Sequence, residues 1–428
     1  MPNFASLPPL SLYVHIPWCV RKCPYCDFNS HEARSSRSRH PASRDISASL
    51  HVTIPEQEYI DALLRDLEQD LPRVWGRIVH TIFIGGGTPS LFSPEAIDRL
   101  LSGIRARLSL DQNVEITLEA NPGTVVAPAH PAPATFVHPC TSELDRLIGF
   151  RQAGINRLSI GIQSFDEEKL KALGRIHGRA EALRAAEAAR AAGFDNFNLD
   201  LMYGLPGQTV EQALADMRTA MALRPTHLSA YQLTIEPNTL FHARPPTLPD
   251  DDITWEMQSQ LQAELAAADY RQYEVSAYAR PGYECRHNLN YWKFGDYLGI
   301  GAGAHGKLTD AARQTVTRFA KTRHPARYME SARNRECLGA ETLLSARDVV
   351  LEFAMNALRL DAGFTVAGFR EATGLPFGAA AEAISASIDR GLLEIDRTVI
   401  RATPRGQRYL DELLQYWLAE EPRDAGIG

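Results

Sequence analysis

The sequence predicts an α/β protein with a parallel sheet of six strands, followed by a smaller winged-helix-like domain at the C-terminal end. Three observations lead to this prediction. Short runs rich in β-branched residues alternate strictly with longer helical patterns, and parallel strands need such crossover connections. After the last of these units the pattern changes to short helices and a hairpin. The chain has 428 residues, more than one ordinary core contains. A doubly wound sheet and an incomplete (β/α) barrel both fit this alternation.

The six strands are expected at residues 12–16, 79–84, 114–119, 157–162, 197–202 and 228–235. Helical periodicity falls between and after them, at residues 56–71, 94–108, 141–153, 180–192, 210–223 and 255–268. Both candidate folds bind ligands at the carboxyl ends of their strands. Three cysteines follow the first strand, a Gly-Gly-Gly-Thr turn follows the second, and Glu119 ends the third. We therefore expect these groups to share one site.

Two stretches are interpreted as insertions into this core. Residues 31–51 are rich in Ser, Arg and His without periodicity, which predicts a mobile loop. Residues 124–139 are rich in Pro and Ala, which predicts an extended surface excursion.

The C-terminal region has the pattern of a winged helix. Short helices are expected at 348–358, 366–373 and 377–390, then a hairpin at 392–400 and a last helix at 406–418. No dense basic recognition helix occurs, so a packing or interaction role is expected rather than DNA binding. We divide the chain into a core of residues 1–240, an extension of 241–340 and a C-terminal domain of 341–428.

Composition excludes several classes of protein. Hydrophobic residues make up 44% and charged residues 23%, which is typical of globular proteins and excludes fibrous and wholly disordered chains. The formal net charge of −7 disfavours a nucleic-acid partner. No apolar run has the length of a membrane-spanning helix, and the first residues lack the pattern of a signal peptide. The expected location is the cytoplasm.

Three of the six cysteines are clustered, with the spacing C-x3-C-x2-C at Cys19, Cys23 and Cys26. Each can bind one iron of a [4Fe–4S] cluster as a thiolate, which leaves the fourth iron open to an outside molecule. Structural zinc is an alternative, but it needs four ligands, and the fourth would come from His15 or His31. Three buried thiols without a metal are a further alternative.

The residues around these cysteines, Y-V-H-I-P-W-C-x3-C-P-Y-C-D-F at 13–28, resemble the cluster motif of the radical S-adenosylmethionine (SAM) superfamily. The flanks resemble the oxygen-independent coproporphyrinogen oxidase group of that superfamily. The resemblance continues in GGGTPS at 85–90, LEANPG at 118–123, RLSIGIQSF at 157–165, DLMYGLP at 200–206 and GIGAGAH at 299–305. It covers about residues 11 to 420, apart from the two insertions. It implies a partial (β/α)6 barrel.

The resemblance also implies roles for individual residues. The open iron would chelate the amino and carboxylate groups of SAM. The positions that match contacts to this SAM are Tyr13, Tyr25, Gly86, Gly87, Thr88 and Glu119. The positions that match a second SAM are Gln163, Arg175 and Asp200. Taken without the resemblance, the glycines fit a tight turn, and the polar residues fit a solvated strand end or barrel mouth.

Two features distinguish the branches of the group. The coproporphyrinogen dehydrogenases carry a further cysteine two places after the third, and here that place is Phe28. The second feature is an H-N-x-x-Y-W element, which resembles the heme chaperone branch and implies that His287, Tyr291 and Trp292 bind heme. Neutral imidazole ligates heme iron, and aromatic rings suit a porphyrin face. The alternative is that these residues pack the barrel base.

The resemblance therefore implies a chaperone that passes heme to respiratory hemoproteins. The first alternative is an enzyme that decarboxylates coproporphyrinogen III through a SAM radical, and the second is a zinc-stabilised interaction protein. The sequence leaves open whether the protein is an enzyme and whether it forms a homodimer.

A basic segment lies between Arg313 and Arg335, with seven Lys or Arg residues against one acid, Glu330. Such a segment suits heme propionates, an acidic partner or peripheral contact with an anionic membrane. A solvated helix face explains it equally well.

Overall fold

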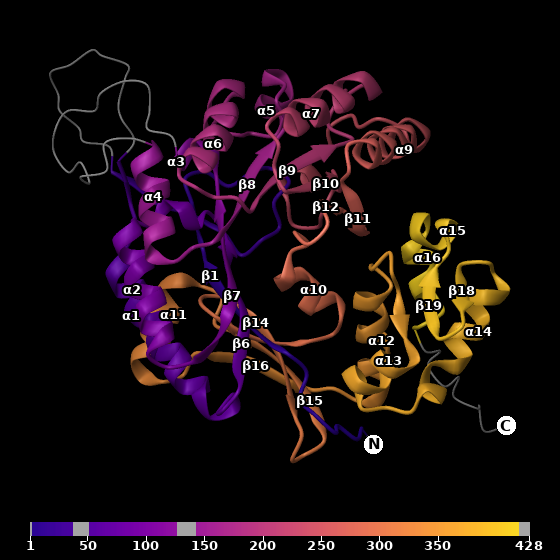
Figure 1. Ribbon diagram of the computed structural model, residues 1–428. Helices are drawn as coiled ribbons and strands as arrows, with labels where there is room; N and C mark the ends of the chain where they lie inside the picture. The colour runs from indigo at the N-terminus through magenta and orange to yellow at the C-terminus, as the bar shows by residue number, and fades with distance from the viewer. Residues whose placement is uncertain (1, 37–50, 126–142, 419–428) are drawn as a thin grey trace, which may run out of the picture.

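The computed structural model of the protein describes residues 2–36, 51–125 and 143–418 (Figure 1). The six predicted strands are confirmed as β1 (Leu10–Ile16), β6 (Ile78–Gly86), β7 (Ser109–Ala120), β8 (Arg157–Gln163), β9 (Phe197–Tyr203) and β10 (His227–Gln232). They are parallel, and each pairs with its neighbour in this series. Because the strand order never reverses, the sheet winds in one direction, as an incomplete barrel does and a doubly wound sheet does not. The last strand ends at Gln232, three residues earlier than expected.

Helices cover the outer face of this sheet (Figure 1). They are α1 (Glu56–Asp70), α2 (Pro94–Arg105), α4 (Glu143–Ala153), α6 (Arg179–Ala191), α7 (Val210–Ala222) and α9 (Asp251–Ala267). N-terminal capping residues mark where two of these helices begin. The Ser93 side chain accepts a hydrogen bond from the Ala96 amide at the start of α2, and Thr209 caps α7 in the same way.

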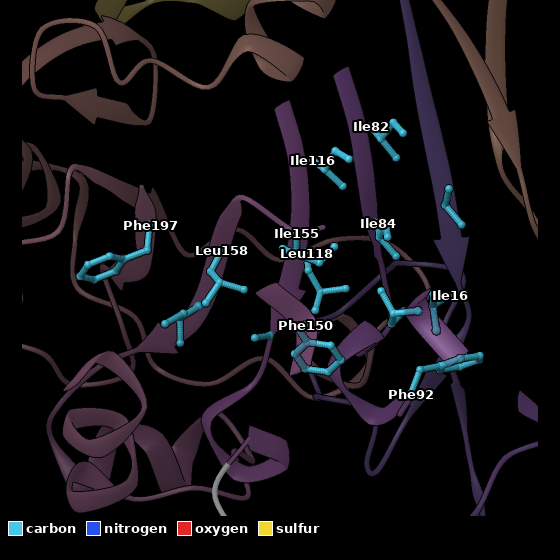
Figure 2. Packing of buried hydrophobic residues seen from close by; sticks show 14 of the residues in the cluster. Ile16, Ile82, Ile84, Phe92, Ile116, Leu118, Phe150, Ile155, Leu158 and Phe197 are labelled. Atoms are coloured by element: carbon cyan, nitrogen blue, oxygen red, sulfur yellow. The ribbon is translucent and has the colours of Figure 1, made fainter. Parts of the chain in front are cut away.

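Successive side chains of the parallel strands point alternately to the helix-covered core and to the inside of the barrel. Ile82 and Ile84 of β6 lie on the face that the helices cover and are fully buried, Ile82 beside Ile116 and Ile84 beside Leu118 of β7 (Figure 2). Residues between them, such as Phe83, take the opposite face because successive side chains of a strand alternate. The opposite face lines the inside of the barrel, so the same strands supply both the core and the candidate site.

The sheet continues beyond the six strands at both edges, and these additional strands were not predicted from the sequence. On one edge lie β13 (Asp296–Ile300), β14 (His305–Asp310), β15 (Thr315–Lys321) and β16 (Leu338–Leu343), and on the other β12 (Ala277–Ala279) and β11 (Arg271–Glu274). The first of these, β13, is parallel to β1, and the remaining five pair antiparallel. The helices α10 (Arg286–Trp292) and α11 (Pro325–Asn334) belong to the same region.

The C-terminal domain (orange to yellow in Figure 1) has its own apolar core around Phe353, Phe364 and Phe369. Its elements are α12 (Ala346–Ala357), β17 (Phe364–Thr365), α13 (Val366–Thr373), α14 (Ala381–Asp389), β18 (Leu393–Asp396) and β19 (Val399–Ala402). Helices with a small antiparallel sheet confirm the predicted winged-helix-like class. The prediction of a single last helix at 406–418 was wrong. The chain leaves helical geometry at Tyr409, between α15 (Pro404–Arg408) and α16 (Leu410–Gln415).

The two predicted insertions are only partly described. The expectation of an irregular loop at 31–51 is wrong at both ends, where β3 (His31–Glu32) pairs with β2 (Trp18–Cys19) and β4 (Arg34–Ser36) pairs with β5 (His51–Thr53). Residues 37–50 lie outside the described part of the chain. In the second insertion, residues 124–125 end the short helix α3 (Pro122–Val125), and 126–139 lie outside the described residues. Among the described helices none combines the length and the apolar character that crossing a bilayer requires.

Candidate functional site

The three clustered cysteines line one cavity at the carboxyl ends of the parallel strands. Cys19 lies on β2, directly after β1, and the other two lie in the loop that follows. All three are free thiols of intermediate exposure. The cavity measures about 760 Å³, and we call it the barrel cavity. It also contains nearly all the SAM positions that the resemblance implies: Tyr25, Gly86, Gly87, Thr88, Glu119, Gln163, Arg175 and Asp200.

The glycine turn is pressed against the cysteine segment. The Gly87 amide donates to the Ile16 carbonyl at 2.7 Å, and the Thr88 amide donates to the Trp18 carbonyl at the same distance. A Cβ atom at Gly87 would lie 2.5 Å from the Trp18 carbonyl oxygen, so only glycine allows this approach. The turn therefore fixes the segment that carries Cys19 beside the ends of β1 and β6.

Two half-buried carboxyl groups, those of Glu119 and Asp200, face the barrel cavity. Glu119 Oε2 accepts a hydrogen bond of 3.0 Å from the Gly86 amide. Burial, with a contribution from nearby Asp200, raises the pKa of Glu119 to about 8. Burial also raises the pKa of Asp200, although Ser159 and Asn198 donate hydrogen bonds to it. A cation such as a sulfonium would favour the charged form of both groups.

Arg175 brings a half-buried positive charge to the cysteines. Its Nη1 donates to Cys23 Sγ at 3.6 Å, and its Nη2 donates to the Gly161 carbonyl at 2.8 Å. Next to it, Gln163 has a φ of 71° after a register shift between β8 and β9. A left-handed backbone conformation costs free energy at a non-glycine residue, and residues in this conformation are frequent at functional sites. The conformation of Gln163 is therefore consistent with a ligand contact.

The donor set fits the implied cofactors. Three free thiols face one cavity, and the Arg175 guanidinium would offset the negative charge of a thiolate-bound cluster. Within the described ranges no three His, Cys, Asp or Glu side chains gather around a point where one metal ion would sit. A cubane is held differently, because each thiolate binds a different iron. Burial raises the pKa of Cys19 and of Cys26 in the metal-free protein.

A second cavity of about 560 Å³, which we call the side cavity, adjoins the first. Both cavities are lined by Asp27, Phe28, Gly86 and Glu119. The walls of the side cavity are mainly aromatic and basic: Tyr13, Tyr291, Trp292, Tyr297, His305, Lys307, Arg318 and Arg323. Phe28 is 59% exposed between the two cavities.

Tyr13 lies in the side cavity and does not line the barrel cavity with the other SAM positions. Its hydroxyl is hydrogen-bonded to His15 Nδ1 at 2.9 Å, and the His15 ring lies where a side chain on Gly86 would collide with it. Tyr13 therefore supports the glycine turn through His15.

The H-N-x-x-Y-W element forms α10, and its residues are divided between two environments. Tyr291 and Trp292 line the side cavity. His287 is buried behind them, with Nδ1 hydrogen-bonded to Thr81 Oγ1 at 2.7 Å and Nε2 to the Tyr291 hydroxyl at 2.9 Å. Burial lowers the pKa of His287 to about 3. Both ring nitrogens of His287 are engaged within the protein, whereas its two neighbours line the cavity wall, and heme binding by these three residues stays a prediction.

Part of the basic segment is engaged within the protein. Lys321 is buried between Asp66 and Asp70, with Nζ at 2.6 Å and 2.5 Å from their carboxylate oxygens. Arg318 pairs with Glu352 at 2.7 Å. The segment forms β15 and α11, so a simple solvated helix face is wrong for these two residues. Arg323 is exposed and lines the side cavity.

Two further residues of the site were not predicted. Asn29 fixes the end of the cysteine loop, since its Nδ2 donates to the carbonyls of Ala302 and Arg323 at 2.8 Å and 2.9 Å. Its position directly after the cysteine motif could have indicated that Asn29 belongs to the site. Arg359 reaches the barrel cavity from the C-terminal domain, with its guanidinium 4.5 Å from the Trp292 ring centroid. No local pattern indicates a contact over this sequence separation.

Comparison with known proteins shows the family of the chain. The sequence profile of the Radical SAM superfamily matches residues 13–220, and that of the HemN C-terminal domain matches residues 344–409. The chain is 49% identical over 420 residues to the "Heme chaperone HemW" of Escherichia coli (strain K12), covering 97% of this chain and 100% of the relative. Its identity to the protein of the same name from Haemophilus influenzae is 48%, with the same coverage.

A more distant relative and a solved structure are also similar. The mouse "Radical S-adenosyl methionine domain-containing protein 1, mitochondrial" is 34% identical, over 94% of this chain and 86% of the relative. The coproporphyrinogen III oxidase HemN of Escherichia coli, described as a radical SAM enzyme, matches with a TM-score of 0.73 and 23% identity. The match covers 96% of this chain and 90% of HemN, and it shows a shared fold.

Proposed function

The chain belongs to the HemW family of radical SAM proteins, and from this membership we propose that it is a heme chaperone that delivers heme to respiratory hemoproteins. The observation that carries the proposal is the pairing of two adjoining cavities. One is lined by three free cysteines beside a glycine turn, and the other has aromatic and basic walls. A porphyrin has a flat apolar face and two carboxylates, which such walls suit.

In this proposal the barrel cavity holds the resident cofactors. Cys19, Cys23 and Cys26 hold a [4Fe–4S] cluster, and the backbone of the glycine turn with Glu119 holds SAM. When bound, the cluster supplies an electron for reductive cleavage of SAM. The protein's own contribution is electrostatic, because Arg175 lies beside Cys23 and Glu119 lines the cavity that SAM would occupy.

The heme belongs to the side cavity in this proposal. Tyr291 and Trp292 contact the porphyrin, and His287 holds Tyr291 in place through their hydrogen bond. The two cavities share Phe28 and Glu119, so bound heme would lie next to the SAM site. This adjacency allows the cofactors to influence heme binding or release.

Oxidation of coproporphyrinogen is the second candidate function. The retained SAM positions and the fold shared with HemN favour it. Against it, Phe28 stands where the coproporphyrinogen dehydrogenases carry a further cysteine, and a phenyl ring cannot donate a proton as a thiol can.

One experiment tests both functions on one sample. The protein is reconstituted anaerobically with iron, sulfide and SAM, and is then assayed for heme binding and for conversion of coproporphyrinogen with a reductant. The expected result is stoichiometric heme binding without multiple-turnover formation of protoporphyrinogen. The Cys19→Ala variant, treated identically, should bind heme but hold no cluster. Protoporphyrinogen formed at many turnovers, or failure of the intact protein to bind heme, would overturn the chaperone proposal.

A further inference from the structure

The side cavity is lined by two histidines in the described part of the chain, and they differ in whether their ring nitrogens are free. His15 uses both, with Nδ1 bonded to the Tyr13 hydroxyl and Nε2 to the Asn29 carbonyl, each at 2.9 Å. His305 is exposed, and among the described residues its ring makes no hydrogen bond. A histidine in a cavity with both nitrogens unoccupied is available to an incoming metal.

The backbone holds His305 firmly although its ring is free. His305 begins β14 and pairs with Ala320 of β15. Directly before it the backbone is tied to the end of β15, by hydrogen bonds from the Gly303 amide to the Thr322 carbonyl at 3.0 Å and from the Lys321 amide to the Ala304 carbonyl at 2.8 Å. A ligand on a regular strand is positioned more accurately than one on a loop.

A glycine brings this strand end to the cysteine loop. Gly303 has a φ of 77°, and a Cβ atom there would lie 2.3 Å from the Asn29 amide nitrogen. The Asn29 side chain donates to the carbonyls of Ala302, which precedes His305, and of Arg323, which follows β15. The GIGAGAH motif therefore places a histidine at the boundary between the cluster loop and the side cavity.

The charges around His305 suit an anionic metalloporphyrin. Partial burial, with Arg318 and Arg323 nearby, lowers the pKa of His305, which keeps the ring neutral at pH 7 and able to donate an electron pair. Arg318 is already paired with Glu352, whereas Arg323 has an exposed side chain without an ion pair among the described residues. The acids on the cavity wall, Asp27 and Glu119, lie at its boundary with the barrel cavity.

We propose that His305 is an axial ligand of the heme iron in the side cavity and that Arg323 pairs with a heme propionate. This inference rests on the proposed function as a heme chaperone and names the ligand within that same site. An imidazole nitrogen of His305 donates its lone pair to the iron, and no proton or electron is exchanged with the protein. His287 then acts as a positioning residue, because its own nitrogens hold Thr81 and Tyr291.

The test uses titrations of the full-length, cluster-reconstituted protein with hemin, followed by absorption and resonance Raman spectroscopy. His305→Ala should weaken hemin binding roughly tenfold or more and shift the Soret band. Added imidazole should restore the original spectrum, since it replaces the missing ligand. His324→Ala is the matched control. His324 is exposed directly before α11, in the same extension of the sheet, but it lines neither cavity. It should behave as the unaltered protein does.

A second pair of variants tests the propionate contact. Arg323→Glu should weaken hemin binding several-fold without moving the Soret band, whereas Arg327→Glu should not, because Arg327 is exposed outside both cavities. An unchanged spectrum and affinity in His305→Ala, in a protein that binds heme, would overturn this inference and leave the proposed function standing. Failure of the intact protein to bind hemin would overturn the proposed function and the inference together.

Discussion

The Nε2 atom of His287 and the hydroxyl of Tyr291 lie 2.9 Å apart, one helical turn from each other on α10. Their rings meet edge to face, with centroids 4.8 Å apart. On its other side His287 is hydrogen-bonded to Thr81 of β6. The histidine therefore connects a strand of the barrel to an aromatic side chain in the wall of the side cavity.

This relationship predicts how His287→Ala behaves. The change leaves the Thr81 and Tyr291 hydroxyls without their buried partner and removes a packed ring, which should lower the free energy of unfolding by about 2–4 kcal/mol. Heme binding should weaken, while the Soret maximum stays in place because the iron ligand remains. Urea unfolding and hemin titration measure the two effects.

The neighbouring thiol provides the control for that experiment. Burial raises the pKa of Cys285 to about 12, so it remains a thiol and a poor metal ligand at pH 7. The double variant Cys285→Ala/His287→Ala should therefore retain the spectrum of the single variant. A Soret shift in His287→Ala that is absent from His305→Ala would identify His287 as the ligand.

Gly86→Ala should damage the site. Gly86 has a φ of 114°, and a Cβ atom there would lie 2.5 Å from the His15 ring, which is held by Tyr13. We expect a loss of roughly 2 kcal/mol or more of stability and a reconstituted protein with little bound SAM. Gly282→Ala is the control, because Gly282 has a φ of 86° but open space around its Cβ position. Equal losses in both variants would mean that backbone strain alone is responsible and that the His15 contact is unimportant.

Local pattern was enough to predict the six parallel strands and the cysteine site. Apolar periodicity marks buried faces, and parallel strands bring their carboxyl ends to one edge wherever they lie in the chain. Eight of the nine predicted SAM positions line the barrel cavity for this reason. The exception, Tyr13, lies within β1, three residues before that strand ends at Ile16.

The side cavity could not be predicted in the same way. His287 and Tyr291 are four residues apart on one helix, but only the packing of α10 against β6 decides that one is buried and the other lines the cavity. The antiparallel extension that carries His305 was missed because its strands are rich in polar and charged residues, without a clear alternation of apolar and polar side chains. Long-range contacts such as Asn29 with Ala302 have no local signature.

The raised pKa of Glu119 predicts a pH dependence of stability. In the folded protein this pKa is about 8, against 4.5 for the free side chain. Between those values the folded state binds the proton and the unfolded state does not, so the free energy of unfolding should fall as pH rises from about 4.5 to 8. Glu119→Gln should remove this part of the dependence in cluster-free protein, as measured by urea unfolding at several pH values. Glu58→Gln, at an exposed position on α1, should leave the pH profile unchanged. Identical profiles for Glu119→Gln and the unaltered protein would mean that Glu119 is ionised in the folded state.

Each of Cys19→Ala, Cys23→Ala and Cys26→Ala should abolish the iron–sulfur absorption, because a cubane with one open iron has no spare thiolate ligand. Cys337→Ala should keep it, since Cys337 is a buried free thiol that lines neither cavity. Iron analysis and Mössbauer spectra of protein kept anaerobic measure the cluster directly. Stoichiometric zinc without iron in such protein would show that the zinc-stabilised alternative is correct.

The buried ammonium of Lys321 predicts the largest stability effect. It lies between Asp66 and Asp70 of α1, and the Tyr328 hydroxyl of α11 donates to Asp66 at 2.7 Å, so the group joins α1, α11 and β15. Lys321→Met leaves the buried Asp66 carboxylate without its counter-charge and leaves Asp70 with only Arg73, 3.6 Å away, which should cost about 3–5 kcal/mol at pH 7. Burial already raises the pKa of Asp70, and without the ammonium it should rise further. Protonation then relieves the repulsion, so the loss should shrink as pH falls toward 5. Urea unfolding of Lys321→Met and of the control Arg327→Met at pH 5 and pH 7 measures this difference. A loss that does not depend on pH would mean that the carboxylates are already neutral beside Lys321, and that packing alone accounts for the effect.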